Sequence, residues 1–137
     1  MPGGRSVLVI EDDQDTRDMY ELLLTMKGFA VQTARTGMEG FTRACESRPG
    51  VILTDLGLPN IDGWEVVRRL KSDTRTNNIP VIVITSLDLD AKDRERLNAG
   101  VQFVLVKERF RPADLVERIR RLVQKKPEVV SGMEAAS

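Results

Sequence analysis

Three carboxylates in this sequence follow short apolar runs of the kind that form buried strands. Glu11 and Asp12 come directly after the run at residues 7–10, and Asp55 comes directly after the run at residues 51–54. Carboxylates that lie close together repel one another unless a cation lies among them. Mg²⁺ prefers oxygen ligands and usually keeps several waters, and an ionised aspartate beside it can act as an oxygen nucleophile and form an acyl phosphate. The residue types therefore predict a magnesium site with Asp55 as the nucleophile.

A hydroxyl and an amine share this placement at strand ends. Thr85 ends the run at residues 81–85, and Lys107 follows the run at residues 103–106. A lysine amine can pair with phosphoryl oxygens, and a threonine hydroxyl can hydrogen-bond one of them. Each residue alone is ordinary, since strands favour threonine, so only their combination with the carboxylates assigns them to the site. Asp13 is interpreted as the start of a helix, where an acid favours the helix dipole, with a third metal ligand as the alternative.

These side chains meet only if the runs before them are strands of one parallel sheet. Four short apolar runs, at residues 7–10, 51–54, 81–85 and 103–106, and a weaker alternating stretch at residues 30–34 are separated by stretches of helical periodicity. Strict alternation predicts an α/β fold with a doubly wound, five-stranded parallel sheet of the flavodoxin-like (βα)5 type. The expected strand order is 2-1-3-4-5 with right-handed crossovers. The carboxyl ends of the first, third, fourth and fifth strands then lie side by side.

The helical stretches differ in the apolar surface that they offer. Gly28 is expected to end the first helix, whose buried face is expected to consist of Met19, Leu22, Leu23 and Met26. The stretch at residues 91–99 is mostly charged, so we expect it to be only lightly buried. The last helix is expected from Pro112, with a strong apolar face formed by Leu115, Ile119, Leu122 and Val123.

Composition argues against several other functions. The 21 basic and 21 acidic residues give a formal net charge of zero, which argues against broad nucleic-acid binding. The sequence contains no histidine, which excludes Ser-His-Asp catalysis and histidine metal ligands. Its single cysteine suits a reducing compartment, and no apolar stretch has the length of a signal peptide or a membrane span. We expect a cytoplasmic protein that contacts neither nucleic acid directly nor a membrane.

The spaced motifs resemble the signature of bacterial two-component receiver domains. The resemblance spans residues 6–123 and rests on Glu11-Asp12, the stretch at residues 54–63 around Asp55, Thr85-Ser86 and Lys107. It implies a response regulator of the stand-alone, chemotaxis-regulator-like type, which acts in phosphorelay signal transduction. Such a protein is not a metabolic enzyme, because it catalyses only its own aspartyl phosphorylation and dephosphorylation.

The resemblance also implies a role for each acidic residue. Asp55 would accept a phosphoryl group from a phosphohistidine on a sensor histidine kinase or a phosphotransfer protein. Asp12 would bind Mg²⁺ directly and Glu11 would bind it through water. Asp55 and the backbone carbonyl of Gly57 would be further ligands.

Two departures from the family's pattern concern the remaining site residues. By resemblance, Thr85 would move toward the phosphoryl group and Lys107 would bridge that group and the acids. The family usually has proline after the lysine, where Glu108 stands, and an aromatic residue three positions before it, where Val104 stands. These departures support a second hypothesis, a pseudo-receiver that binds partners without regulation by phosphorylation. A third hypothesis, a metal-dependent phosphatase, is disfavoured because Gly57 stands where such enzymes usually carry a second acid.

The resemblance makes partner binding the output of the protein. Resembling proteins often use the face of the fourth helix, fifth strand and fifth helix for downstream protein targets, and we expect the same face to serve here. A homodimer is a further expectation. Residues 1–5 are expected to be an N-terminal extension, residues 6–124 the receiver domain, and residues 125–137 a disordered tail.

Overall fold

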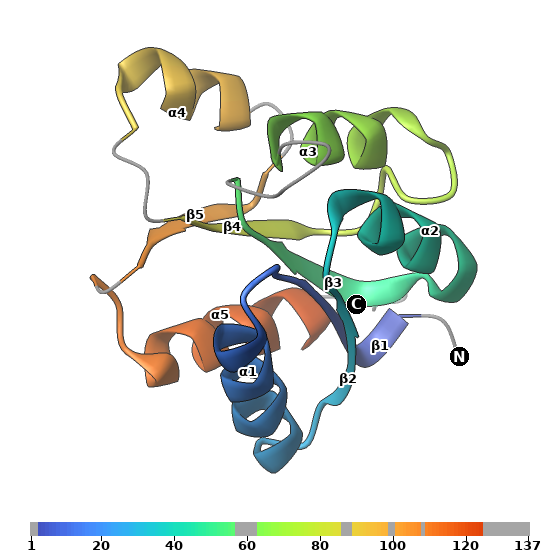
Figure 1. Cartoon of the computed structure of the whole chain (residues 1–137), viewed down its shortest axis with the longest axis vertical. Helices are drawn as coiled ribbons and strands as arrows, with labels where there is room; N and C mark the ends of the chain where they lie inside the picture. Colours follow the sequence, from blue (N-terminus) through green and yellow to red (C-terminus); the bar gives the residue numbers. More distant parts are fainter. Residues whose placement is uncertain (1–2, 57–62, 86–88, 99–100, 108, 125–137) are drawn as a thin grey trace, which may run out of the picture.

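Five parallel strands form one sheet in the computed structural model, which describes residues 3–56, 63–85, 89–98, 101–107 and 109–124 (Figure 1). The strands are β1 (Gly3–Ile10), β2 (Ala30–Ala34), β3 (Pro49–Thr54), β4 (Val81–Thr85) and β5 (Phe103–Val106). Their order in the sheet is β2-β1-β3-β4-β5, and every neighbouring pair is parallel. The predicted α/β fold and strand order are therefore confirmed. β1 reaches back to Gly3, inside the predicted N-terminal extension, and the predicted tail lies outside the described residues.

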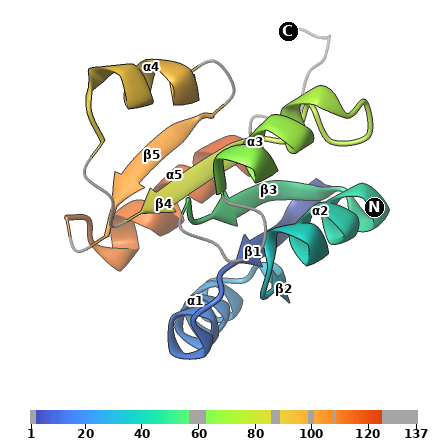
Figure 2. The ribbon, with the colours of Figure 1, turned by 45° about the horizontal axis from the view of Figure 1, so that its top comes forward.

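Helices cover both faces of the sheet. They are α1 (Gln14–Met26), α2 (Gly37–Ser47), α3 (Gly63–Ser72), α4 (Ala91–Asn98) and α5 (Pro112–Gln124). Helices α1 and α5 lie together on one face, and α2, α3 and α4 lie on the other (Figures 1 and 2). No helix in the described ranges is long and apolar enough to cross a membrane.

The strands are apolar along their whole length because both faces of the sheet are covered. Every residue of β3 and β4 is buried. Alternate side chains enter separate cores: Leu8 and Ile10 pack with the α2 and α3 side, whereas Val7 and Val9 pack with the α1 and α5 side. Because β1, β3 and β4 pack against a core on each face, the positions of their carboxyl ends are fixed.

Helix α1 buries a different face from the one expected. Its buried residues are Tyr20 and Leu24, while Met19, Leu22 and Met26 are exposed at 52%, 64% and 73%. The predicted face of α1 was therefore wrong for Met19, Leu22 and Met26, whereas Leu23 packs against the core. The helix carries two apolar stripes at helical spacing, and the one with Tyr20 and Leu24 packs on the sheet.

The ends of α1 follow the sequence signals. Asp13 is the N-cap, and its carboxylate accepts hydrogen bonds from the Thr16 N–H at 2.9 Å and the Thr16 hydroxyl at 2.7 Å. This confirms Asp13 as a helix-capping residue. Gly28 has φ +93° just beyond the helix, a conformation that side-chain-bearing residues rarely adopt, and it lets the chain turn so that Phe29 donates to the Leu24 carbonyl at 3.0 Å.

Candidate functional site

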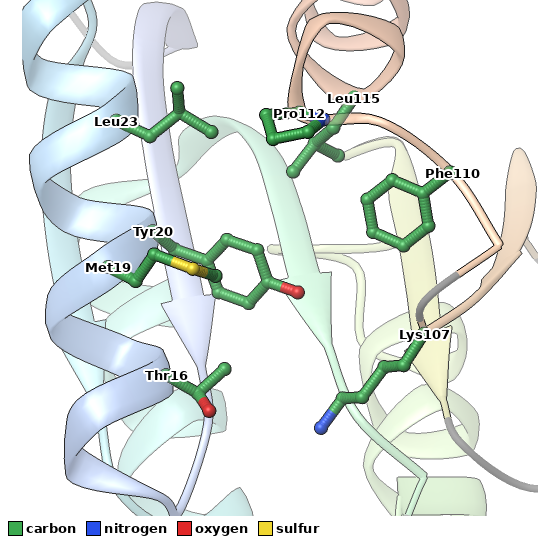
Figure 3. Close-up of a pocket in the computed structure, with 8 residues that line it drawn as sticks. All are labelled: Thr16, Met19, Tyr20, Leu23, Lys107, Phe110, Pro112 and Leu115. Atoms are coloured by element: carbon green, nitrogen blue, oxygen red, sulfur yellow. The ribbon is translucent and has the colours of Figure 1, made fainter.

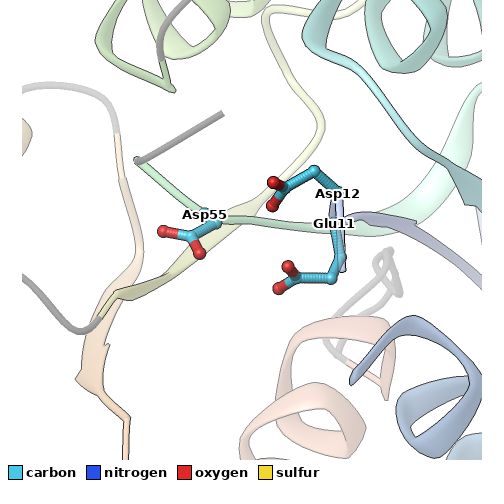
Figure 4. Close-up of side chains that lie close together, drawn as sticks. All are labelled: Glu11, Asp12 and Asp55. Atoms are coloured by element: carbon cyan, nitrogen blue, oxygen red, sulfur yellow. The ribbon is translucent and has the colours of Figure 1, made fainter. Parts of the chain in front are cut away.

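The acidic residues meet because the strands that carry them end in register. Ile10 of β1 pairs with Thr54 of β3, so the residues after them, Glu11 and Asp55, emerge next to each other. Oxygen atoms of Glu11, Asp12 and Asp55 all lie within 4.8 Å of one another (Figure 4). Carboxylates at this spacing need only small movements to bind one Mg²⁺, whose oxygen ligands lie ~2.1 Å from the ion.

Lys107 reaches this acidic cluster from the end of β5, which lies two strands along the sheet from β3. Its backbone N–H donates to the Thr85 carbonyl at 2.8 Å, which extends the pairing of β4 with β5 and fixes the start of the side chain. Its Nζ atom lies 2.9 Å from Asp55 Oδ2 and 3.4 Å from Glu11 Oε1. The amine therefore bridges the carboxylates that follow β1 and β3.

The electrostatics of the cluster favour an added cation. Burial raises the pKa of Glu11, and the nearby Asp55 carboxylate adds to this effect, whereas the hydrogen bond from the Asp13 N–H and the charge of Lys107 oppose it. Partial burial lowers the pKa of Lys107, but the hydrogen bond to Asp55 and the charges of both acids outweigh it, so that this pKa is raised. A divalent cation between the carboxylates would relieve the cost of ionising buried Glu11.

The comparisons with known proteins agree with this geometry. Residues 7–120 match the response regulator receiver domain. This chain belongs to the response regulator receiver domain family. The matched range contains Glu11, Asp12, Asp55, Thr85 and Lys107.

Curated relatives of this receiver domain are response regulators. The DNA-binding dual master transcriptional regulator RpaA of Synechocystis sp. is 34% identical over 119 residues, which cover 87% of this chain and 49% of the regulator. The transcriptional regulatory protein AfsQ1 of Streptomyces coelicolor is 40% identical over 102 residues, which cover 74% and 44%. The polar-differentiation response regulator DivK of Brucella anthropi is 34% identical over 96 residues, which cover 70% and 77%. The chain spans about half the length of the two transcriptional regulators.

Solved receiver domains share the fold. The chemotaxis response regulator CheY4 of Vibrio cholerae has a TM-score of 0.78 and 27% identity, and the match covers 87% of this chain and 98% of that one. The receiver domain of the sensor histidine kinase PA1611 from Pseudomonas aeruginosa has a TM-score of 0.79 and 29% identity, and the match covers 88% and 98%. The latter structure holds a magnesium ion in its active-site cleft. In this chain the acidic cluster offers carboxylate oxygens, the type of ligand that Mg²⁺ prefers.

Thr85 and Val104 lie on the neighbouring strands β4 and β5. Thr85 is fully buried at the end of β4, in register with Val106. Val104 packs on the core of the α2 and α3 side, together with Trp64, whereas its neighbour Phe103 packs on the α5 side. Phe103 therefore lies on the wrong face of the sheet to replace the usual aromatic residue.

Some predicted residues lie outside the described ones. These are Gly57, Ser86 and Glu108, so the carbonyl ligand and the substitution after Lys107 stay predictions.

Gly63 belongs to the stretch at residues 54–63, but no role at the site was predicted for it. Its N–H donates to the Leu56 carbonyl at 2.8 Å, and a Cβ placed on it would collide with the backbone of Asp55 and Leu56. The Asp-Gly pair before α3 was the available signal, since glycine marks positions where two backbones approach closely.

A cavity beside the acidic cluster was also missed. Its volume is about 390 Å³, and it opens between α1 and the segment that leads from β5 into α5 (Figure 3). Lys107 lines this cavity at one end, and the remaining walls are mostly apolar: Thr16, Met19, Tyr20, Leu23, Phe110, Pro112 and Leu115. The sequence assigned Met19 and Leu23 to the core and so gave no signal for an opening there.

Proposed function

We propose that this receiver domain accepts a phosphoryl group on Asp55 from a phosphohistidine. The observation that carries the proposal is the position of Asp55 beside one lysine and two acids. Lys107 Nζ lies 2.9 Å from the Asp55 carboxylate, and the carboxylates of Glu11 and Asp12 complete the cluster. An Asp55 oxygen attacks phosphorus, the phosphorus–nitrogen bond breaks, and its electron pair returns to the imidazole ring. The chain has no histidine, so the donor is a separate protein, a sensor histidine kinase or a phosphotransfer protein.

Mg²⁺ is the cofactor of this proposal. Asp12 and Asp55 would hold it directly, Glu11 through water, and the Gly57 carbonyl would be a further ligand. When bound, the ion neutralises negative charge on the phosphoryl group during transfer. The fit rests on the carboxylate spacing and on the raised pKa of Glu11, both of which favour a divalent cation in this place.

Lys107 and Thr85 would handle the transferred group. The Lys107 amine contacts both Asp55 and Glu11. After transfer the negative charge lies on the phosphoryl oxygens, and the amine would pair with one of them. The Thr85 hydroxyl would donate to another phosphoryl oxygen. These new contacts exist in only one state of the switch, so they shift the population toward that state.

The output of the switch is altered partner binding. We assign downstream protein targets to the face of α4, β5 and α5, where charged residues of both signs are exposed. The relative RpaA is named as a DNA-binding transcriptional regulator, which supports a cytoplasmic setting. Direct contact of this chain with DNA is not part of the proposal, because its basic and acidic residues balance. The pseudo-receiver hypothesis is not favoured, because the acidic cluster and its lysine are both in place.

The test is phosphoryl uptake from a small donor. Wild-type protein incubated with acetyl phosphate and Mg²⁺ should gain the mass of one phosphoryl group, and Asp55→Asn should not. Asp18→Asn is the matched control, because Asp18 is an exposed acid of α1 outside the cluster. Removal of Mg²⁺ with EDTA should abolish the gain. Uptake in Asp55→Asn, or no uptake by wild-type protein, would overturn the proposal.

A further inference from the structure

The short turn that carries the acidic pair lies between two regular elements. Glu11, Asp12 and Asp13 belong to neither β1 nor α1. The Glu11 N–H donates to the Ala34 carbonyl of β2 at 3.0 Å, but this bond fixes only the peptide group before Glu11. The two peptide groups on either side of the Asp12 Cα set the two free backbone dihedrals of Asp12. Whatever holds those two groups therefore decides the direction in which the Asp12 side chain leaves the backbone.

The side chain of Arg17 holds both of these peptide groups. Its Nη1 atom donates to the Glu11 carbonyl at 3.0 Å and to the Asp12 carbonyl at 3.4 Å. The second group is also held through its N–H, since Asp13 donates to the Glu11 carboxylate at 3.1 Å. Hydrogen bonds from a charged donor are stronger than those between neutral groups. One arginine nitrogen thus contacts the backbone before and after Asp12.

The place of Arg17 in the chain needs a reason of this kind. Arg17 is the fourth residue of α1, and a positive charge in the first turn of a helix opposes the helix dipole. Its backbone N–H donates to the Asp13 carbonyl at 2.9 Å, and its side chain is half-buried, so it folds back over the turn. The plainer explanation, that Arg17 only stabilises the start of α1, conflicts with the sign of the dipole.

We propose that Arg17 is a positioning residue of the magnesium site, because it holds the turn that directs Asp12 and Glu11 toward Asp55 (Figure 4). Arg17 would contact neither the ion nor the phosphoryl group. This inference rests on the proposed function, since it concerns the same site. It also fixes the sign of an effect. An arginine that acted only through its charge would repel a divalent cation, and its removal would strengthen metal binding. Removal of an arginine that positions the ligands weakens metal binding instead.

The first experiment measures metal affinity directly. Mn²⁺ takes the same oxygen ligands as Mg²⁺, and electron paramagnetic resonance records the free ion. Arg17→Met keeps the length of the side chain but removes the charge and both hydrogen bonds, and it should raise the dissociation constant for Mn²⁺ by about tenfold or more. Arg17→Lys keeps a charged donor and should recover part of the affinity. A dissociation constant that is unchanged or lower in Arg17→Met would overturn the role of Arg17.

A control variant separates positioning from a general loss of stability. Leu24 is fully buried near the other end of α1, so Leu24→Val weakens the packing of the same helix without touching the turn, and it should bind Mn²⁺ like wild-type protein. Circular dichroism confirms that each variant is folded. A rise in the dissociation constant for Leu24→Val equal to that for Arg17→Met would also overturn the proposal.

Phosphoryl uptake provides a second measurement. Arg17→Met should need about tenfold more Mg²⁺ than wild-type protein for half-maximal uptake from acetyl phosphate, whereas Leu24→Val should need the same concentration as wild-type protein. Wild-type protein that binds no Mn²⁺, or Asp12→Asn that binds it normally, would remove the proposed magnesium site and this inference with it. Metal binding that depends on Asp12 but not on Arg17 would overturn this inference alone.

Discussion

Helices α4 and α5 come directly before and after β5 in the chain and are both rich in charge, but they are attached to the protein in different ways. Helix α5 buries Leu115, Val116, Ile119 and Val123 against the sheet. Helix α4 buries no side chain between Ala91 and Arg96. The charged composition of the α4 stretch predicted this light burial, and the structure confirms it.

Among the described residues, the apolar contacts around α4 lie just outside its two ends. Leu89 packs on the core before the helix, and Val101 is buried after it. In addition, the Arg96 guanidinium lies 4.3 Å from the centre of the Trp64 ring of α3. A helix held in this way can shift without opening the core, whereas any movement of α5 exposes apolar surface. We therefore expect α5 and the strands under it to stay rigid, and α4 to be free to move when the state of Asp55 changes.

The strongest test of this difference is a deletion of buried surface in α5. Ile119→Ala should lower the free energy of unfolding by about 2–5 kcal/mol, because it removes a fully buried side chain and leaves a cavity. Arg94→Ala, at an exposed position of α4, should change it by less than about 0.5 kcal/mol. Urea titration followed by circular dichroism measures both. Equal losses for the two variants would remove the distinction between the helices.

Gly63 connects the acceptor residue to the α3 and α4 side, and a methyl group added there should have the next largest effect. Gly63→Ala forces the start of α3 away from the backbone of Asp55 and Leu56, at a cost of about 1–3 kcal/mol in stability. It should also slow phosphoryl uptake from acetyl phosphate. Arg68→Ala is the control, because Arg68 lies on the same helix with a side chain that is 64% exposed. Normal uptake by Gly63→Ala would show that this contact does not position Asp55.

Mg²⁺ bound at the acidic cluster should raise the free energy of unfolding of the protein. At ten times its dissociation constant the ion adds about 1.4 kcal/mol to the free energy of unfolding. Without the ion, the raised pKa of Glu11 makes the folded protein bind more protons than the unfolded chain just above pH 4.5, so stability falls as pH rises through this range. The gain from Mg²⁺ should therefore be larger at pH 7.5 than at pH 5. Thermal unfolding measures it.

Matched variants separate the acidic cluster from general ion effects. Asp12→Asn should abolish the stabilisation by Mg²⁺, and Asp18→Asn should keep it. A gain that is the same at both pH values, or that persists in Asp12→Asn, would place the ion elsewhere.

The sheet order and the meeting of Glu11, Asp55 and Lys107 could be predicted from the sequence, because buried parallel strands have uninterrupted apolar runs and end at a common edge. The buried face of α1 could not be predicted. Helical spacing shows which residues share a side, but α1 has two apolar sides, and only packing against the sheet selects Tyr20 over Met19. The contact of Gly63 with the backbone beside Asp55 likewise depends on where α3 starts in space. The roles of the site residues stay predictions.

The smallest effect, and the most specific to α4, concerns the contact between Arg96 and Trp64. Trp64 is the only tryptophan in the chain, so tryptophan emission reports on the surroundings of this ring, which include Arg96. Arg96→Ala should cost only about 0.5–1 kcal/mol in stability. If phosphorylation moves α4, the emission of wild-type protein should change when acetyl phosphate and Mg²⁺ are added. The change should be lost in Arg96→Ala, partly kept in Arg96→Lys and fully kept in Arg94→Ala. An unchanged response in Arg96→Ala would mean that α4 does not report the state of Asp55 through this contact, and the light attachment of the helix would then need another role.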